Sequence, residues 1–226
     1  MQIFVLNGGF GKRVRSISKN NPKCMIKFNK KPFIYHQIKL LKKKGFREII
    51  FCLGYKSNKI INYLKTIKFK NLNIRYVVEK KKLGTGGALI NSKKKMKNYF
   101  YLTYGDSYLD INYKRIYSNF LREKSMNCAM TVVNKKYVKY HKSNITLTNN
   151  QIIHYGYSNK SDYIDFGAII FKKKIFNKKK NQRVDLKKII NELVENKSLK
   201  IFKIYKKFLQ IGTIKGINEF KKYLNV

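Results

Sequence analysis

The sequence predicts an α/β fold with a mixed, mainly parallel sheet that has helices on both faces. Apolar stretches of strand length alternate with amphipathic helical segments through the first half of the chain. Glycine-rich turns follow the first strand and a later one, at the positions where open parallel sheets bind ligands. Strand-like segments with turns between them fill much of the second half, which predicts more antiparallel pairing there.

The first half alternates strand and helix in a regular order. Pro32 suits the first turn of a helix, apolar residues at helical spacing follow it, and Gly45 favours the end of that helix. A second helix is predicted over residues 60–67, and a third over 88–96, opened by the glycine-rich segment 84–87. The predicted strands are 3–6, 48–53, 72–78 and 99–104.

The second half changes character but shows no boundary. Its predicted strands are 128–133, 145–147, 152–155, 164–171 and 201–204. Helices are predicted over 186–193 and 217–224. Because there is no linker-like stretch and no internal repeat, we predict a single domain over residues 1–226.

The charge of the chain is unusual. The 226 residues contain 52 Lys and Arg against 11 Asp and Glu, a formal net charge of +41. Such a balance can indicate nucleic-acid binding. However, the lysines are spread along the whole chain, and Lys, Asn, Ile, Tyr and Phe are all in excess, as an A/T-rich genome would impose. We therefore attribute the charge to composition and expect no specific nucleic-acid surface, although anionic small molecules will be attracted.

The cysteines and histidines show no metal-ligand spacing. Cys24, Cys52 and Cys128 lie far apart with no Cys-x-x-Cys motif, which suits a reduced cytoplasm and argues against a disulfide framework or a zinc site. No apolar run reaches transmembrane length, so we expect no membrane insertion. The chain starts directly with a predicted strand, and we expect no signal peptide.

The first glycine-rich turn has the composition of a phosphate-binding loop. It reads Gly8-Gly9-Phe10-Gly11-Lys12-Arg13, so backbone amides and cations lie directly after a predicted strand. It is not a Walker loop, because Leu6 and Arg13 occupy the positions of the first glycine and the last Ser or Thr. It is not a dinucleotide fingerprint either, since no third glycine and no immediate helix follow. A plain surface turn is the alternative.

Other turns at the same sheet edge complete a candidate site. The backbone amides of residues 84–87, the cations Arg13 and Lys23, and the carboxylate of Asp106 are expected to meet there. A carboxylate beside phosphate-binding cations is a good Mg²⁺ ligand. This set suits transfer from a nucleoside triphosphate, with cations neutralising the phosphates.

At these residues the chain resembles the sugar-1-phosphate nucleotidyltransferases, and within them the small heptose-1-phosphate guanylyltransferase-like proteins. The resemblance extends over nearly the whole chain. The motifs that carry it are Gly8-Gly9-Phe10-Gly11-Lys12-Arg13, Pro22-Lys23-Cys24-Met25, Lys31-Pro32, Glu79 with Leu83-Gly84-Thr85-Gly86-Gly87-Ala88, Gly105-Asp106, and Ile211-Gly212-Thr213.

The resemblance implies a Rossmann-like nucleotide-diphospho-sugar transferase fold, with nucleotide binding in about residues 1–110 and sugar-phosphate binding in about 111–226. It implies that Arg13, Lys23 and Asp106 are catalytic, and that Mg²⁺ is held by Asp106 and the residue at position 210. The implied nucleotide-binding residues are Leu6, Gly8, Gly9, Gly11, Lys12, Arg13, Glu79, Gly84 and Thr85. The implied sugar-phosphate-binding residues are Lys160, Asp165 and Gly167.

The chain departs from the family pattern at three places. Lys12 replaces the threonine of the first loop, which adds a cation and removes a hydroxyl. Gln210 stands where the family carries a second metal carboxylate, and an amide oxygen can ligate Mg²⁺ only without charge. The family lysine for the sugar phosphate is expected near residues 155–160, where Tyr157 takes the aligned position and Lys160 is the nearest cation.

Because acids are few, the possible second charged metal ligands can be counted. Asp110, Asp162 and Asp165 are the candidates, while acids such as Asp185 fall on predicted helices away from the loop edge. Asp165, followed by Gly167, starts an apolar strand where the family meets its sugar. Its carboxylate is expected either to hold sugar hydroxyls or to bind the metal.

The sequence thus predicts a cytoplasmic, Mg²⁺-dependent enzyme that transfers a nucleoside monophosphate to a sugar 1-phosphate for surface polysaccharide precursors. Glu79 offers two acceptor oxygens, which favours GTP, with CTP possible through its exocyclic amine. One rival is a catalytically impaired homologue that binds nucleotide or sugar nucleotide, suggested by Gln210. The other is a nucleic-acid-binding protein, suggested only by charge; it lacks an RNA-recognition signature.

Overall fold

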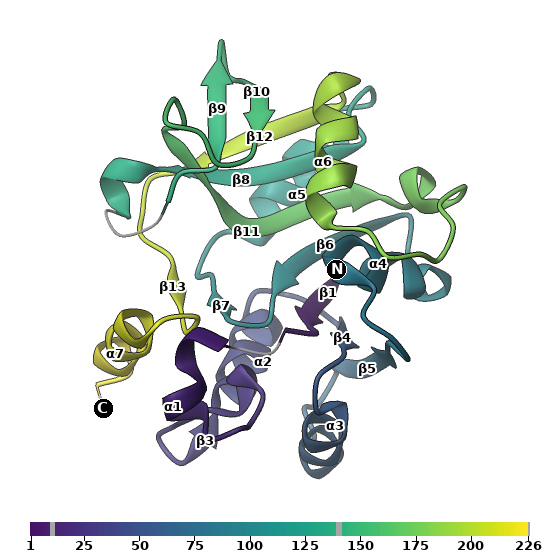
Figure 1. Ribbon diagram of the computed structural model, residues 1–226. Helices are drawn as coiled ribbons and strands as arrows, with labels where there is room; N and C mark the ends of the chain where they lie inside the picture. The colour runs from purple at the N-terminus through teal and green to yellow at the C-terminus, as the bar shows by residue number, and fades with distance from the viewer. Residues whose placement is uncertain (10–11, 139–141, 226) are drawn as a thin grey trace.

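A single nine-stranded sheet forms the centre of the molecule (Figure 1). The computed structural model describes residues 1–9, 12–138 and 142–225. The strands of this sheet are β1 (Gln2–Asn7), β4 (Glu48–Leu53), β5 (Asn73–Val78), β6 (Tyr99–Tyr104), β8 (Cys128–Asn134), β9 (Ile145–Thr148), β10 (Gln151–Tyr155), β11 (Tyr163–Lys172) and β12 (Leu199–Ile204). Their order is β10-β9-β11-β6-β1-β4-β5, with β8 paired to β11 and β12 paired to β8.

The strand directions confirm the predicted mixed sheet. β1 is parallel to both β4 and β6, and β5 is parallel to β4. β11 is antiparallel to β6 and β8, and β9 and β10 form a hairpin. Two short ladders join β2 (Lys27–Phe28) to β3 (Lys31–Pro32) and β7 (Ser107–Tyr108) to β13 (Leu209–Gln210).

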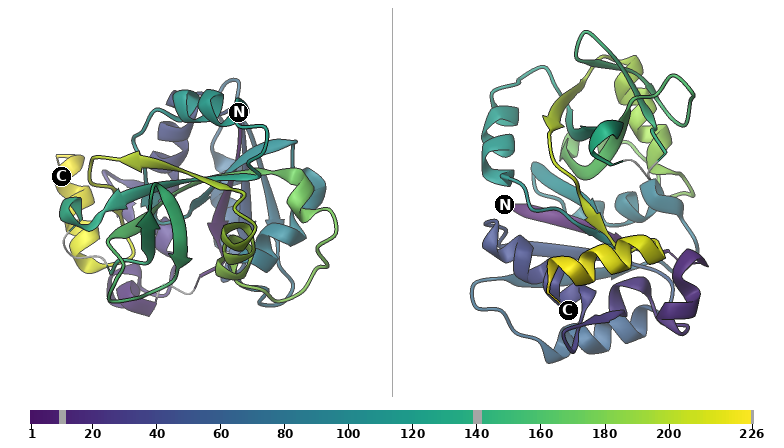
Figure 2. Two further views of the ribbon diagram at one scale, coloured as in Figure 1. Left: turned by 90° about the horizontal axis from the view of Figure 1, so that it is seen from above. Right: turned by 90° about the vertical axis from the view of Figure 1, so that its left-hand side faces the viewer.

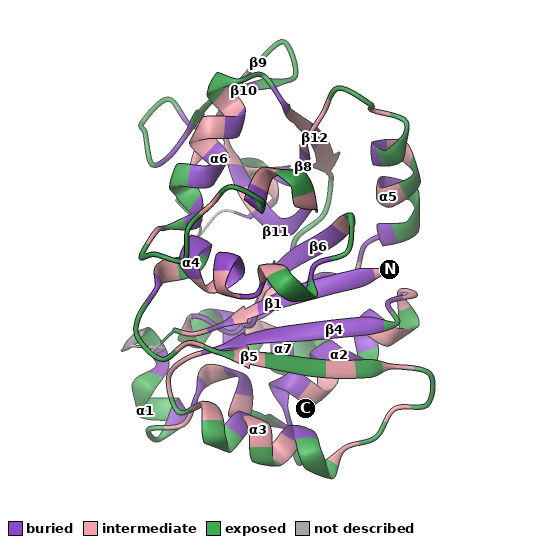
Figure 3. Ribbon diagram, turned by 90° about the vertical axis from the view of Figure 1, so that its right-hand side faces the viewer, coloured by how far each residue is buried: buried purple, intermediate pink, exposed green. Residues whose placement is uncertain are grey.

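Helices cover both faces of the sheet, as predicted. The helices are α1 (Arg15–Ser18), α2 (Phe33–Lys43), α3 (Ser57–Thr66), α4 (Gly84–Asn91), α5 (Tyr113–Leu121), α6 (Leu186–Glu195) and α7 (Ile214–Tyr223). Ile3 and Val5 of β1 pack in the core that holds α2, α3, α5 and α7, whereas Phe4 packs in the core that holds α4 and α6. Such alternation is the period of a strand buried on both faces. β4 is buried along its length, while the edge strand β5 is largely exposed (Figure 3).

Several helix predictions need correction. A helical turn (Lys12–Val14) and α1 follow the first loop directly, although the sequence predicted no immediate helix; α1 is short because Lys19 and Asn20 adopt left-handed conformations, φ 44° and 63°. α4 starts at Gly84 and ends at Asn91, rather than covering 88–96. α5 was not predicted. Among the described residues, no helix is both long and apolar enough to cross a bilayer.

The C-terminal segment returns to the N-terminal half of the chain. After β13 pairs with β7, α7 packs against the segment that contains β2 and the start of α2 (Figure 2). The ring of Phe220 on α7 lies with its centroid 4.8 Å from that of Phe28 and 5.0 Å from that of Phe33. All three rings are buried, so α7 is part of the core and holds β13 beside the end of β6.

Replacing Phe220 with Ala should lower the free energy of unfolding by about 3–5 kcal/mol, because it leaves a cavity among aromatic rings. Lys221→Ala on the same helix is the matched control, since Lys221 is exposed and its removal should change stability by less than about 0.5 kcal/mol. Urea unfolding of the two variants measures both values. Equal free energies of unfolding for the two variants would show that α7 does not contribute to the core.

Candidate active site

The candidate site lies at the edge of the sheet where the parallel strands end. β1, β4, β5 and β6 point the same way, so the segments that follow them meet at one edge. A cavity of about 430 Å³ opens there. The sequence-predicted residues on its wall are Leu6, Gly8, Gly9, Lys23, Glu79, Gly84, Thr85 and Asp106.

Glu79 lies between the ends of β1 and β4. A Cβ at Gly8 would lie 3.2 Å from Glu79 Oε1, and a Cβ at Gly54 would contact the same oxygen. Glycine at both positions therefore leaves the space that the Glu79 carboxylate occupies. The Leu83 backbone N–H donates to Glu79 Oε2 at 3.1 Å, which fixes the turn before α4. Sequence reasoning missed Gly54, although it directly follows a predicted strand.

Lys23 and Asp106 form an ion pair on the cavity wall. Lys23 Nζ donates to Asp106 Oδ2. Lys23 starts the helical turn Lys23–Met25, and Asp106 follows β6, so the pair joins two segments far apart in the sequence. Both side chains are about one-fifth exposed, at 21% and 22%, and hence accessible to a ligand in the cavity.

One wall of the cavity comes from the second half of the chain. Residues 182–186, which we call the strap, cross the start of α4. Val184 N–H donates to Leu83 O (2.8 Å), Gly87 N–H donates to Val184 O (2.9 Å), and Leu186 N–H donates to Thr85 Oγ1 (2.8 Å). The amide of Gly87, predicted for the phosphate cradle, is thus used by the strap, and the Thr85 hydroxyl is an acceptor within the protein.

The close approach of the strap explains two glycines of α4. A Cβ at Gly87 would lie 2.5 Å from Gln182 O, and a Cβ at Gly86 would lie 3.0 Å from both the Asp185 carbonyl carbon and Ile189 Cδ1. These distances are below normal van der Waals contact. The Gly84–Gly87 segment is therefore needed for packing against the strap as well as for the site.

Sequence reasoning missed three charged residues on the cavity wall, namely Lys82, Arg183 and Asp185. The placement of Asp185 away from the loop edge was wrong. Asp185 is the residue before α6, and the strap carries it to the cavity. Its position just before the apolar helical pattern of α6 was the available signal, because helix-initiating acids lie outside the helix.

Asp165 lies beyond Tyr104 in a partly buried polar cluster. Tyr104 and Tyr155 donate their hydroxyls to Asp165 Oδ2 at 2.9 and 3.1 Å, and the Gly167 N–H donates to Oδ1 at 2.8 Å. Burial raises the pKa of Asp165, and these hydrogen bonds oppose that rise. Gly167 has a φ of +93°, a conformation that favours glycine. Since Tyr104 also lines the cavity, the cluster continues the site away from Glu79.

The other two acids considered as second metal ligands are paired elsewhere. Asp110 pairs with Lys44, which lowers the pKa of Asp110, and Asp162 Oδ1 lies 2.5 Å from Lys135 Nζ. Neither acid lines the cavity. Within the described residues, no group of three or more His, Cys, Asp or Glu side chains could hold a metal ion.

Gln210 lies beside Asp106. Ile211 N–H donates to Asp106 O at 2.9 Å, and the strand β13 pairs Gln210 with Ser107. A Cβ at Gly212 would lie 2.7 Å from Gln210 Oε1 and 2.9 Å from Asp106 Oδ2, so both oxygens approach the same point. Gln210 Oε1 accepts the Gly212 N–H, and its Nε2 donates to Thr213 Oγ1 at 2.9 Å.

The remaining predicted site residues are not part of this wall. Arg13 and Lys160 are exposed and do not line the cavity. Gly11 lies outside the described residues, as does the side chain of Lys12. Cys24 lines the cavity, but burial raises the pKa of its thiol to about 12, so it is not a thiolate nucleophile at neutral pH.

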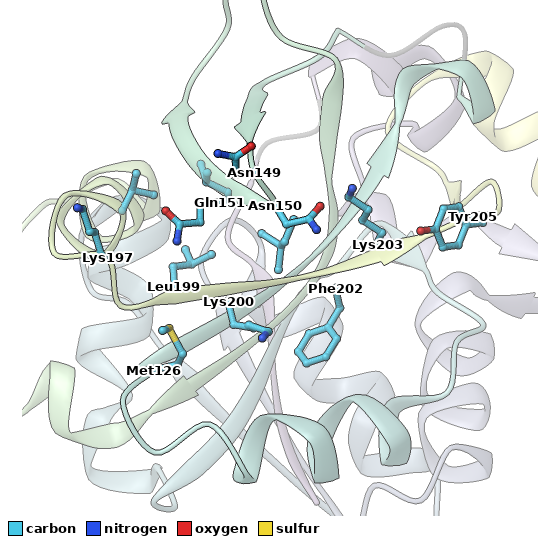
Figure 4. Close-up of a pocket in the computed structure, with 13 residues that line it drawn as sticks. Met126, Asn149, Asn150, Gln151, Lys197, Leu199, Lys200, Phe202, Lys203 and Tyr205 are labelled. Atoms are coloured by element: carbon cyan, nitrogen blue, oxygen red, sulfur yellow. The ribbon is translucent and has the colours of Figure 1, made fainter.

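A larger hollow, of about 590 Å³, lies over the edge strand β12 (Figure 4). Asn149 and Asn150 of the β9–β10 turn and Gln151 at the start of β10 stand above it, and Lys200 and Lys203 project from β12. Its described lining contains no acid, histidine or cysteine and none of the glycine motifs. Lysines on an edge strand also protect it from pairing with other chains. The chemistry therefore points to the smaller cavity.

Comparisons with known sequences identify the family of the chain. A family model described as nucleotidyl transferase matches residues 3–225. The chain is 40% identical over 119 residues to D-glycero-alpha-D-manno-heptose 1-phosphate guanylyltransferase of Campylobacter jejuni, a match that covers 53% of each protein. It is 28% identical over 181 residues to the protein of that name from Aneurinibacillus thermoaerophilus, covering 78% of this chain and 76% of that one. The match to the Campylobacter relative thus spans about half of its length.

Solved structures share the fold. HddC from Yersinia pseudotuberculosis matches with a TM-score of 0.80 and 25% identity over 99% of both chains. A structure of HddC complexed with GMP-PN matches with a TM-score of 0.83 and 24% identity, again over 99% of both chains. A putative glucose-1-phosphate thymidylyltransferase from Bacillus anthracis matches with a TM-score of 0.82 and 19% identity, over 99% of this chain and 94% of that one.

Replacing Gly87 with Ala should destabilise the protein by about 1–3 kcal/mol, because the new Cβ overlaps the strap. A Gly→Ala change at an exposed helix position normally stabilises the protein, so a decrease in the free energy of unfolding would itself indicate the overlap. Gly9→Ala is the control, since among the described residues that are not its chain neighbours no heavy atom lies within 4 Å of that Cβ. Urea unfolding compares the two variants, and a stabilised Gly87→Ala protein would contradict the packing of the strap on α4.

Proposed function

Because the chain belongs to the nucleotidyl transferase family, we propose that it transfers a guanylyl group from GTP to a sugar 1-phosphate, giving a nucleotide sugar and pyrophosphate. The observation that carries this proposal is the cavity that brings Gly8, Lys23, Glu79 and Asp106 together at one sheet edge. The names of the curated guanylyltransferase relatives support the substrate class.

The triphosphate would occupy the end of the cavity that holds the first glycine turn. Gly8 and Gly9 allow the backbone to approach the phosphates, and Lys23, Lys82 and Arg183 add positive charge around them. Preorganised cations stabilise charge that develops on the phosphates in the transition state. Lys23 leaves Asp106 and contacts a phosphate oxygen when the nucleotide binds.

The reaction needs positioning more than proton transfer. An oxygen of the sugar phosphate attacks the α-phosphorus, the bond from the α-phosphorus to the bridging oxygen of the β-phosphate breaks, and pyrophosphate leaves with that electron pair. The nucleophile is already an anion, so no general base is required. The protein holds the two substrates in line and neutralises their charges.

Glu79 is the proposed contact to the base. Guanine presents N1–H and N2–H₂ donors on its pairing edge, and a carboxylate can accept both. Glu79 Oε2 accepts one backbone N–H and keeps a lone pair, while Oε1 faces Gly8 and Gly54. Uracil and thymine would place acceptors against this negative charge. GTP is therefore preferred, and CTP is the alternative through its exocyclic amine.

Asp106 and Gln210 would hold Mg²⁺. Their oxygens approach one point, and hard oxygen donors suit this ion, which keeps several water and phosphate ligands. Bound there, Mg²⁺ would neutralise charge on the phosphates. Such nucleotide sugars serve as precursors of surface polysaccharides, and the three buried free cysteines suit a reducing cytoplasm.

One observation favours a second candidate function. Both polar atoms of the Gln210 side chain are engaged within its own turn, by Gly212 and Thr213, and the amide carries no charge. A homologue that binds nucleotide or sugar nucleotide without turnover would tolerate this. No described residue on the cavity wall favours nucleic acid as the ligand.

A screen for pyrophosphate release tests the proposal. Purified protein is incubated with Mg²⁺, each nucleoside triphosphate and a panel of sugar 1-phosphates, and GTP should give the highest rate. Asp106→Ala should lose more than about 100-fold in rate because it removes the charged metal ligand, while its circular dichroism stays unchanged. Faster turnover of UTP or dTTP than of GTP would contradict the role of Glu79. A normal rate in the Asp106→Ala variant would contradict the role of Asp106.

Binding of guanine nucleotide without any turnover would support the second candidate function, a homologue that binds nucleotide without catalysis.

Gln210→Asp should lower the Mg²⁺ concentration needed for half-maximal activity, by roughly 10-fold, because a charged ligand replaces a neutral one. Gln210→Asn is the control, as it keeps the amide and shortens the side chain. The measurement is a Mg²⁺ titration of pyrophosphate release. An unchanged Mg²⁺ dependence would show that position 210 does not serve the metal.

A further inference from the structure

The turn that carries Asp106 is bridged by one side chain of another element. Gly105 and Asp106 form the turn between β6 and β7. Gln37 Nε2 donates to Tyr104 O at 2.9 Å and to Ser107 O at 2.7 Å. These two carbonyls belong to the residues directly before and directly after the turn, so a single amide group holds both of its ends.

Gln37 lies on α2 and is only 2% exposed. Both atoms that its amide contacts are carbonyl oxygens, which only accept, so the NH₂ group must face the turn. Among the described residues, the other end of the amide, Gln37 Oε1, is buried without a hydrogen-bond partner. An unpaired buried acceptor costs free energy that an apolar side chain would avoid. Packing therefore does not explain a glutamine here, whereas the need for its two N–H donors does.

Backbone groups hold the same turn from two other directions. The Gly105 N–H donates to Leu6 O at 2.9 Å, which ties the turn to β1. The Ile211 N–H donates to Asp106 O, also at 2.9 Å, which ties it to the segment after β13. The amide from α2 adds a third direction, and it is a contact that one substitution can remove without changing the backbone of the sheet.

We propose that Gln37 is a positioning residue for the metal, because its bridge holds the Asp106 carboxylate at the point where that carboxylate meets Mg²⁺. The inference rests on the proposed function, in which Asp106 and Gln210 bind the ion. Mg²⁺ demands nearly ideal octahedral geometry, so a small displacement of one ligand lowers its affinity. Without the bridge both carbonyls lose a donor, the turn shifts, and the Asp106 carboxylate leaves the point that it shares with Gln210 Oε1.

The test replaces Gln37 with Met, which keeps the length of the side chain and removes both donors. The Mg²⁺ concentration needed for half-maximal pyrophosphate release should rise roughly 10-fold, because groups that orient a metal ligand affect metal affinity by about this much. If circular dichroism shows that Gln37→Met does not fold, Gln37→Asn takes its place. Gln37→Asn keeps the amide but withdraws it from the turn, and it should raise the Mg²⁺ requirement in the same direction.

Gln2→Met is the matched control. Gln2 is also 2% exposed, and its amide makes hydrogen bonds with Glu48, Lys95 and Lys97 at the opposite end of β1. Gln2→Met should therefore lower the midpoint of urea unfolding, as the loss of any buried amide does, and leave the Mg²⁺ requirement unchanged. A purely structural role of Gln37 would give the same result for both variants.

Equal Mg²⁺ requirements in the Gln37 and Gln2 variants would overturn this inference and leave the proposed function standing. If the wild-type protein releases no pyrophosphate with any substrate pair, the proposed function fails. Binding of the Mn²⁺–GTP complex, measured by the relaxation rate of water protons, then decides the role of Gln37. Weaker binding in the Gln37 variant than in Gln2→Met supports that role, and any other result overturns it.

Discussion

The pairing of β1 with two parallel neighbours is the constraint on which the site depends. The register sets Asn7 opposite Leu53 of β4 and Leu6 opposite Tyr104 of β6. The residues that follow, Gly8, Gly54 and Gly105, therefore leave the sheet at nearly one level. A strand buried on both faces cannot slip by one residue without moving its apolar side chains to the wrong face. The core thus fixes the positions of Glu79 and Asp106.

The strap makes the site a joint product of both halves of the chain. Its hydrogen bonds to α4 bring Arg183 and Asp185 to the cavity that Gly8, Lys23 and Asp106 also line. A ligand bound in this cavity would contact residues from both halves of the chain. The glycines of α4 serve this contact, because any side chain at Gly87 would separate the two segments.

Much of the fold and part of the site follow from local sequence. Apolar alternation predicts the strands, and the glycine turns predict the edge where Gly8, Lys23 and Asp106 meet, since parallel strands end together. The strap could not be predicted. Its partners lie about 100 residues apart in sequence (Thr85 and Leu186), and no local pattern encodes their contact. α5 was missed although its buried residues have helical spacing, and the residues after Asp106 were interpreted only as a motif extension.

A crystal structure of the protein with a non-hydrolysable GTP analogue and Mg²⁺ would show whether the nucleotide occupies the cavity at the ends of β1 and β6. We expect guanine at Glu79, phosphates at Gly8 and Gly9, and Lys23 on a phosphate oxygen rather than on Asp106. The metal should contact Asp106. Nucleotide bound elsewhere, for example in the hollow over β12, or an intact Lys23–Asp106 pair beneath the bound triphosphate, would contradict this expectation.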